Sequence, residues 1–107
     1  MRMWDVRPTV MCRKHLLGEH VEMHMAVGSI RRNKSISGYT DNGLLDTSKI
    51  KERHDALVIE MRARGYKHYS IMLYDDVLND GSVDADDNLI ALCARCAECS
   101  ERSQNDN

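Results

Sequence analysis

The chain has few of the residues that build large, rigid cores. It has no phenylalanine, one tryptophan and one proline among its 107 residues. It also lacks an apolar run long enough for a membrane span, and no signal-peptide pattern follows Met1. We therefore expect a cytoplasmic protein of a bacterium or infected host cell, without membrane contact. Seven methionines, with leucine, isoleucine and valine, are left to fill a small and adaptable core.

Charge is distributed unevenly along the chain, although the formal net charge is only −2. Residues 1–67 carry 13 Lys and Arg against 8 Asp and Glu, whereas residues 68–107 carry 2 against 9. A basic front part favours a polyanionic partner, although an excess of this size also fits an ordinary solvated surface. We interpret residues 1–107 as a single domain with a basic part and an acidic C-terminal helix and tail.

Hydrophobic periodicity predicts an all-α fold, a single compact domain of about three helices joined by loops. Pro8 and Thr9 form a start signal for the first helix, and Gly65 is a good terminator for the second. Residues 66–78 fit either an extended segment or a short helical turn. The helices are expected at residues 10–30, 47–64 and 84–99.

Two rows of side chains run along the first predicted helix. One row is apolar and is expected to face the core. A polar row of His15, Glu19 and Glu22 follows at i, i+4 and i+7, immediately beside it. Polar groups at the edge of a core suit a cleft, although a solvated face with a local Glu–His pair also fits this spacing. The apolar row consists of Cys12, Leu16, Met23, Val27 and Ile30.

The four cysteines are candidate zinc ligands. Cys93, Cys96 and Cys99 are three residues apart, and each such step on a continuous α-helix rotates the side chain by about 60° from its predecessor. The three thiols can therefore meet one tetrahedral ion, with Cys12, only if the helix breaks. We expect small buried thiols and one partly exposed thiol, with no metal and no disulfide, and keep a zinc-binding regulator as an alternative.

His20 and His24 are one helical turn apart and form a second metal candidate. The run from His20 to His24 is not the zincin motif, because the glutamate stands at the third position of the run instead of the second. We expect both imidazoles on the exposed side of a basic helix, in water or against phosphate.

The first two-thirds of the chain resembles the phage pyrimidine dimer DNA glycosylases, the UV-repair enzymes called endonuclease V. The resemblance rests on His15-Leu16-Leu17-Gly18-Glu19-His20-Val21-Glu22, at a fixed distance from the N-terminus. A weaker match is Glu60-Met61-Arg62-Ala63-Arg64-Gly65-Tyr66. It implies a DNA glycosylase with AP lyase activity that acts on pyrimidine dimers or abasic sites in double-stranded DNA, without a cofactor.

The resemblance also implies the catalytic groups. Enzymes of this family use the α-amine of the N-terminal residue as nucleophile and a glutamate of the first helix, which correspond here to Met1 and Glu22. Because Arg2 is too large to follow a removable methionine, we expect the amine to be that of Met1. An amine nucleophile beside a carboxylate is suited to Schiff-base chemistry at a sugar carbon. Arg2 and His15 are then expected to hold phosphate or sugar.

Four basic residues are expected to contact the DNA backbone without regard to sequence: Lys14, Arg31, Arg32 and Lys34. Two positions depart from the family pattern, because Val21 and Met25 stand where the family carries arginines that grip kinked DNA. The family's aromatic, basic C-terminal tail is here an acidic helix with cysteines. A monomer is expected, and a non-catalytic helical DNA-binding module remains the alternative function.

Overall fold

The computed structural model describes residues 1–68 and 70–106, and in this part of the chain every regular element is helical, as predicted. None of the described helices is long and apolar enough to cross a lipid bilayer. The five α-helices are α1 (Arg13–Arg31), α2 (Ser37–Thr40), α3 (Ile50–Ala63), α4 (Ala85–Arg95) and α5 (Ala97–Asn105), and two 3₁₀ turns are η1 (Pro8–Val10) and η2 (Thr47–Lys49).

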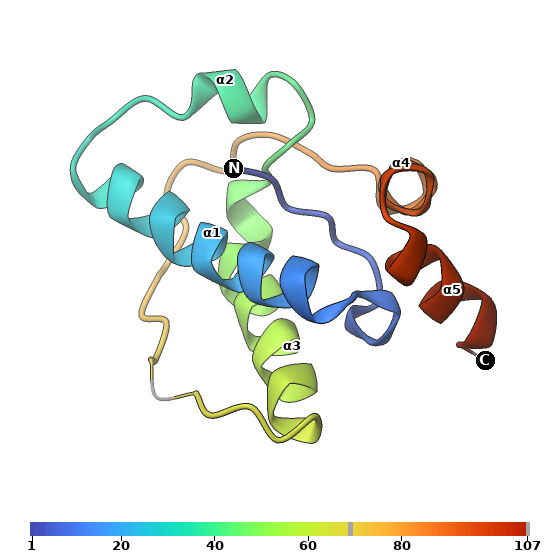
Figure 1. The fold of residues 1–107 in the computed structure, drawn as a ribbon. Helices are drawn as coiled ribbons and strands as arrows, with labels where there is room; N and C mark the ends of the chain where they lie inside the picture. The colour runs from blue at the N-terminus through green and yellow to red at the C-terminus, as the bar shows by residue number, and fades with distance from the viewer. Residues whose placement is uncertain (69, 107) are drawn as a thin grey trace.

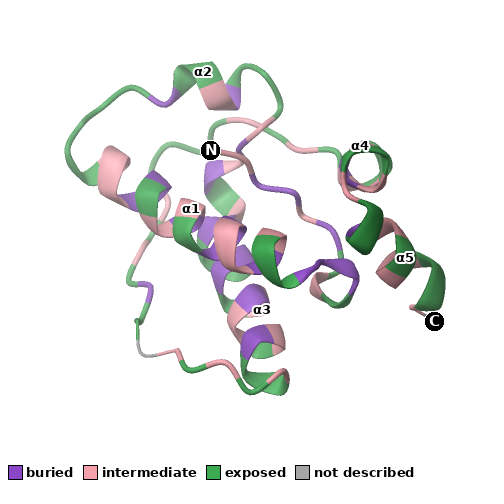
Figure 2. Ribbon diagram, in the orientation of Figure 1, coloured by how far each residue is buried: buried purple, intermediate pink, exposed green. Residues whose placement is uncertain are grey.

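Helices α1 and α3 pack against each other at the centre of the fold (Figure 1). Their buried side chains join those of the N-terminal segment in one core, which Figure 2 shows as purple stretches on all three. Thioether side chains contribute much of it, as the sequence predicts. The buried methionines are Met3, Met11, Met23, Met61 and Met72.

The N-terminal segment, residues 1–7, runs without regular secondary structure between α1 and α4 (Figure 1). The backbone N–H of Met3 donates to the carbonyl of Leu44 at 2.7 Å. On the other side, the Asn88 side-chain amide of α4 donates to the carbonyls of Met3 and Trp4 at 3.3 and 2.9 Å. The loop before η2 and helix α4 therefore both fix the position of the first residues.

Helix α1 begins three residues later than predicted, at Arg13. Pro8 and Thr9 instead start the short turn η1, after which Met11 and Cys12 are extended. The N-cap is therefore Cys12, whose Sγ accepts the His15 backbone N–H at 3.5 Å, and not Thr9. The thiol of Cys12 is turned toward the first turn of the helix as a result.

The end of α3 confirms the predicted glycine terminator. Gly65 adopts φ +84°, and the Tyr66 N–H donates to the carbonyl of Met61 at 2.9 Å, as in a Schellman cap. The described part of residues 66–84 that follows has no helix or strand. Gly81 is required in that segment, because a Cβ on it would lie 2.0 Å from the carbonyl oxygen of Leu45.

The third predicted helix is wrong in one respect, because it is two helices. At Cys96 the backbone is extended (φ −132°, ψ 109°), so that α4 ends and α5 begins in a new direction. Cys96 itself caps α5, with its Sγ accepting the Cys99 N–H at 3.5 Å. Cys99 is fully buried, whereas Ile90 of α4 is 69% exposed.

Candidate functional site

Glu22 lies beside the N-terminus. Its Oε2 accepts the backbone N–H of Arg2 at 3.1 Å, which ties the middle of α1 to the first peptide bond of the chain. The Glu22 and Met1 residues are both half-buried. The structure thus places Glu22 beside the residue that follows Met1, while the α-amine of Met1 forms no ion pair with Glu22 among the described residues.

Glu19, one turn earlier on α1, has a different environment. Its carboxylate is fully buried and pairs with Arg53 of α3 in two contacts, Nε–Oε2 at 2.5 Å and Nη2–Oε1 at 3.0 Å. Arg53 Nη1 also donates to the carbonyl of Val6 at 2.6 Å. Burial raises the pKa of Glu19, while the hydrogen bond and charge of Arg53 oppose this rise. Glu19 therefore positions the N-terminal segment and is not available to a substrate.

Arg2 is a cation without a carboxylate partner among the described residues. Its guanidinium lies 4.0 Å from the centre of the Trp4 ring, and Nη2 donates to Asn88 Oδ1 at 2.8 Å. Its Nε has no hydrogen-bond partner within the described chain. Burial and the positive charge of Arg95, which approaches the same ring, lower the pKa of Arg2. An unpaired guanidinium on the residue whose backbone contacts Glu22 suits an anion.

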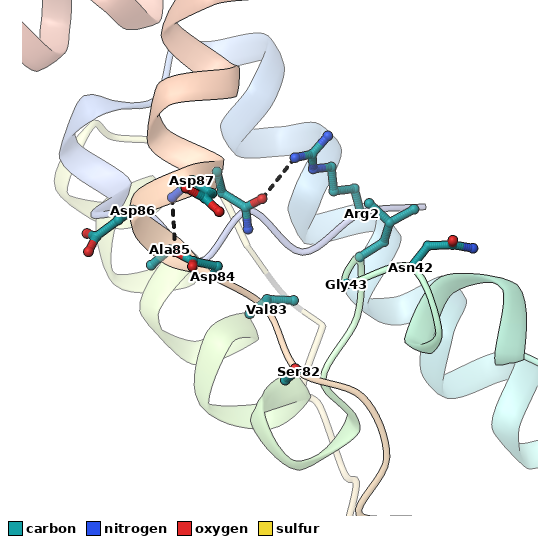
Figure 3. Close-up of a pocket in the computed structure, with 11 residues that line it drawn as sticks. Arg2, Asn42, Gly43, Ser82, Val83, Asp84, Ala85, Asp86 and Asp87 are labelled. Atoms are coloured by element: carbon teal, nitrogen blue, oxygen red, sulfur yellow. Dashed lines mark hydrogen bonds between the residues drawn. The ribbon is translucent and has the colours of Figure 1, made fainter.

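A cavity of about 670 Å³ lies between Arg2 and the start of α4 (Figure 3). Arg2 stands on one wall, and Asp84, Asp86 and Asp87 stand on the other. Three carboxylates at a helix N-terminus interact favourably with the helix dipole, but they repel a phosphate. A nucleic acid backbone is therefore expected to approach Arg2 and Glu22 from the α1 side.

The exposed face of α1 beside Glu22 carries an aligned stripe of four residues. At about 100° per residue, Lys14, Val21, Met25 and Arg32, the last of which caps the end of α1, fall within about 40° of one another around the helix axis. All four are exposed, Val21 and Met25 by 53% and 55%. The stripe is apolar in its centre and basic at both ends.

Arg31 and Lys34, the other predicted DNA contacts, lie at the C-terminal end of α1 and just beyond it. Both are exposed. The Arg31 guanidinium also donates to the carbonyl of Leu73, which attaches the irregular segment after α3 to α1. Their role toward DNA stays a prediction.

His15 lies among cysteine thiols. Its Nδ1 is 3.1 Å from Cys12 Sγ and 3.6 Å from Cys99 Sγ, and its ring packs edge-on against Trp4. Burial, with the charges of Lys14 and Arg95, lowers the pKa of His15. Nδ1 therefore faces the interior and not a substrate, so the proposed contact of His15 with sugar or phosphate depends on the remaining ring atoms. Cys96 completes this group, whereas Cys93 is outside it.

The expectation for His20 and His24 is wrong in part, because His20 is buried and His24 half-buried. Their rings meet those of His54 and His68, and His20 Nε2 lies 2.7 Å from His68 Nε2. Burial and the three neighbouring imidazoles lower the pKa of His20 to about 4. Sequence spacing could show only the pair on α1, because the other two histidines come from α3 and the segment after it.

With this geometry in place, comparison with known proteins decides the family. The family model described as pyrimidine dimer DNA glycosylase matches residues 1–72. The chain belongs to this family. None of the curated proteins and none of the solved structures compared with the chain matches it.

Membership of the pyrimidine dimer DNA glycosylase family places the protein among DNA-repair glycosylases, with damaged DNA as its partner. The matched region contains Glu22, Arg2 and the basic residues of α1, but it ends before α4. Two supporting residues escaped the sequence analysis. Arg53 lies in an amphipathic helix, and the sequence pattern of such a helix does not distinguish a buried arginine from an exposed one. Asn88 lies outside the region that the family model matches.

Proposed function

We propose that the protein is a DNA glycosylase and AP lyase that acts on pyrimidine dimers or abasic sites through the α-amine of Met1. Glu22 is the catalytic carboxylate in this proposal. Arg2 binds a phosphate next to the reacting sugar. Family membership supports glycosylase chemistry in general, and the residues around the N-terminus support this particular mechanism.

The observation that carries the proposal is the 3.1 Å hydrogen bond from the Arg2 backbone N–H to Glu22 Oε2. It holds a carboxylate one residue away from the α-amine. Glu19, the competing carboxylate on the same helix, is occupied by Arg53. Glu22 forms no ion pair among the described residues, so its second oxygen is available to a proton or a cationic intermediate.

The chemistry needs only the amine, the carboxylate and water. At an abasic site the amine adds to the C1′ carbonyl carbon, and loss of water leaves an imine between C1′ and the terminal nitrogen. Removal of a C2′ proton then breaks the C3′–O bond and expels the phosphate. Water hydrolyses the remaining imine and restores the amine. At a damaged base, the same attack displaces the base from C1′ and breaks the glycosidic bond.

The carboxylate and the charged surface have separate roles in this scheme. Glu22 stabilises the positive charge of the imine and can move the proton that the elimination releases. Lys14 and Arg32 are 18 residues apart on the stripe, or about 27 Å along the helix, so they can contact phosphates on either side of the reacting nucleotide. Access to C1′ requires that the nucleotide be distorted or flipped out of the duplex.

Borohydride trapping tests the proposal directly. A chain with an unmodified N-terminus, verified by intact mass, is incubated with a duplex that contains one abasic site, and borohydride reduces any imine to a stable amine. We expect a covalent protein–DNA adduct, and peptide mapping should locate it on Met1. A second duplex with a single pyrimidine dimer reports whether base release precedes strand cleavage.

The matched control is the same chain with an acetylated N-terminus, which should bind DNA but form no adduct. Equal trapping by the acetylated chain, or no trapping by the free one, would contradict the mechanism. Salt-sensitive DNA binding without any adduct would instead support the non-catalytic DNA-binding module.

A further inference from the structure

We propose that Cys12, His15, Cys96 and Cys99 form a zinc site that joins the start of α1 to the start of α5. The four ligand atoms, three Sγ and His15 Nδ1, lie within 4.8 Å of one another. Three cysteines and one histidine are a ligand set of structural zinc sites, which are tetrahedral and closed to solvent. The sequence alone pointed to Cys93 as the fourth ligand, whereas the fold places His15 there.

The distances fit a single tetrahedral ion. Zinc bonds of about 2.3 Å to sulfur and about 2.05 Å to nitrogen place two sulfurs about 3.8 Å apart, and sulfur and nitrogen about 3.6 Å apart. The structure has Cys12 Sγ and Cys96 Sγ at 3.9 Å, and Cys99 Sγ and His15 Nδ1 at 3.6 Å. Cys12 Sγ and His15 Nδ1 are closer, at 3.1 Å, and need to move apart by about half an ångström.

The backbone around the cluster favours thiolates. Cys12 and Cys96 are the N-caps of α1 and α5, so the positive ends of two helix dipoles meet at the cluster. The Cys12 N–H donates to Cys99 Sγ at 3.2 Å. A hydrogen bond from the Cys99 backbone lowers the pKa of Cys96, whereas burial raises the pKa of Cys99 to about 12. A bound cation is what allows crowded thiols of this kind to ionise together.

The proposed zinc site explains why the helix is interrupted between α4 and α5. On a continuous helix Cys96 and Cys99 diverge, and the extended Cys96 brings both thiols to one point. The ligands then form two short pairs, Cys12 with His15 and Cys96 with Cys99, separated by 84 residues in sequence. A zinc ion there would fasten the C-terminal helices to the helix that carries Glu22.

Metal analysis with cobalt substitution tests the site. Tag-free protein, reduced and reconstituted with Zn(II) or Co(II), is freed of unbound metal and analysed by mass spectrometry and absorption. We expect the Co(II) protein to show thiolate-to-cobalt charge transfer and tetrahedral ligand-field bands. Chelation of zinc should lower the melting temperature, because metal that binds only the folded state stabilises it.

Cys93→Ser is the matched control, because Cys93 lies outside the cluster and should retain the cobalt spectrum. Cys96→Ser should lose one equivalent of metal and weaken the charge-transfer band. Cys96→His keeps a ligand at the position, and it should bind metal with an altered spectrum even where the serine variant does not fold. No thiolate band in the reduced wild-type protein, or equal loss in Cys93→Ser, overturns the proposal.

A separate cluster carries a second proposal. We infer that His20, His24, His54 and His68 bind another divalent transition-metal ion, because their four ligand nitrogens also lie within 4.8 Å of one another. His24 Nε2 and His54 Nε2 are 3.1 Å apart, close to the roughly 3.3 Å that two nitrogens have on one tetrahedral zinc. All five histidines of the chain and three of its four cysteines thus belong to one of two clusters.

Asp55 is the independent observation at this second site. Its Oδ1 lies 2.9 Å from His54 Nδ1, which leaves His54 Nε2 directed at the other imidazoles. A carboxylate on the outer nitrogen is the usual support of a metal-binding histidine.

Zinc stoichiometry separates the two sites, and each serves as the other's control. Wild-type protein should hold about two zinc ions per chain, and Cys96→Ser and His20→Gln about one each, because each change removes a ligand from one site only. Asp55→Asn should weaken the thiol-free site by about tenfold or more in zinc titration. About one ion in the wild-type protein, with its cobalt spectrum wholly of thiolate character, overturns the second proposal.

Discussion

The N-terminal segment is held from two sides, and the two sides use different chemistry. On the side of α1 and α3, a buried ion pair of Glu19 and Arg53 reaches the carbonyl of Val6. On the side of α4, the neutral amide of Asn88 holds the carbonyls of Met3 and Trp4 and the guanidinium of Arg2. The first side lies within the family match and the second lies outside it.

The proposed reacting groups and one of the elements that position them therefore lie in different parts of the chain. The matched region contains the proposed nucleophile and carboxylate, but their position depends partly on a helix beyond residue 72. Removing either partner of a buried charge pair strongly destabilises the fold, because the remaining charge is buried without a counter-charge or water around it. A neutral amide contributes less and can be replaced at lower cost. The comparison therefore predicts a graded series of effects.

Glu22→Gln should have the largest effect on activity. The amide preserves the shape of the side chain but cannot carry negative charge or accept the proton, so we expect strand cleavage at an abasic site to fall by about 10²–10⁴-fold. DNA affinity and melting temperature should change little, since Glu22 is half-buried and outside the ion pairs of the described chain. Single-turnover cleavage, with filter binding as the control, checks this. Unchanged cleavage would remove Glu22 from the mechanism.

Glu19→Gln should have the largest effect on stability. It leaves the Arg53 guanidinium buried without a counter-charge, which costs about 3–5 kcal/mol in the free energy of unfolding. Urea denaturation measures this loss. Lys51→Gln is the control, because it removes an exposed pair with Asp55 that contributes about 0.3–0.5 kcal/mol. Similar losses in both variants would mean that Glu19 does not position the segment.

Asn88→Ala tests the other side of the segment. It removes the hydrogen bonds to two carbonyls and to Arg2, so we expect a loss of about 1–3 kcal/mol in stability. Cleavage should also slow under conditions where the variant is fully folded, because Met1 and Arg2 become less constrained. Ser82→Ala, on the wall of the same cavity, should change neither quantity. Full activity of folded Asn88→Ala would show that the family-matched region alone positions the terminus.

Lys14→Ala and Arg32→Ala should have the smallest effects. Each is expected to weaken binding to undamaged duplex DNA and to reduce the slope of log affinity against log salt by about one. Neither should alter cleavage at saturating enzyme, because both side chains are exposed and remote from Glu22 along α1. Lys51→Ala, on α3, provides the control for a generic loss of charge. Equal slopes for all three variants would exclude the α1 stripe as the DNA contact.

Local patterns predicted much of this fold because they depend on neighbours in sequence. The periodicity of α1 and α3 and the glycine terminator at Gly65 are both confirmed. The start of α1 was placed too early, because a Pro-Thr pair can begin a 3₁₀ turn as well as a helix. The break at Cys96 has no glycine or proline to mark it, so a single helix was the natural prediction.

For the candidate site, the sequence could predict only the positions of the catalytic residues along the chain, and not their contacts. Glu22 and Met1 were selected by their separation and by the family resemblance, and the structure adds a hydrogen bond from the Arg2 backbone N–H, one residue after Met1, to Glu22. The difference between Glu19 and Glu22 was invisible to helical spacing, because both belong to one row. It depends on Arg53, which lies 34 residues after Glu19. The two metal clusters depend on contacts across 84 and 48 residues.

The sequence by itself determined the helical class, the central pair of helices and the family. The helices follow from short-range hydrophobic periodicity, and the family follows from a motif at a fixed position. Only the tertiary structure decided which glutamate remains available, which thiols meet His15 and which histidines converge. The physical reason is that burial, ion pairing and metal coordination are properties of atoms that approach one another in space. A one-dimensional pattern shows which groups are present, and the packing of α1 against α3 and α5 decides which of them interact.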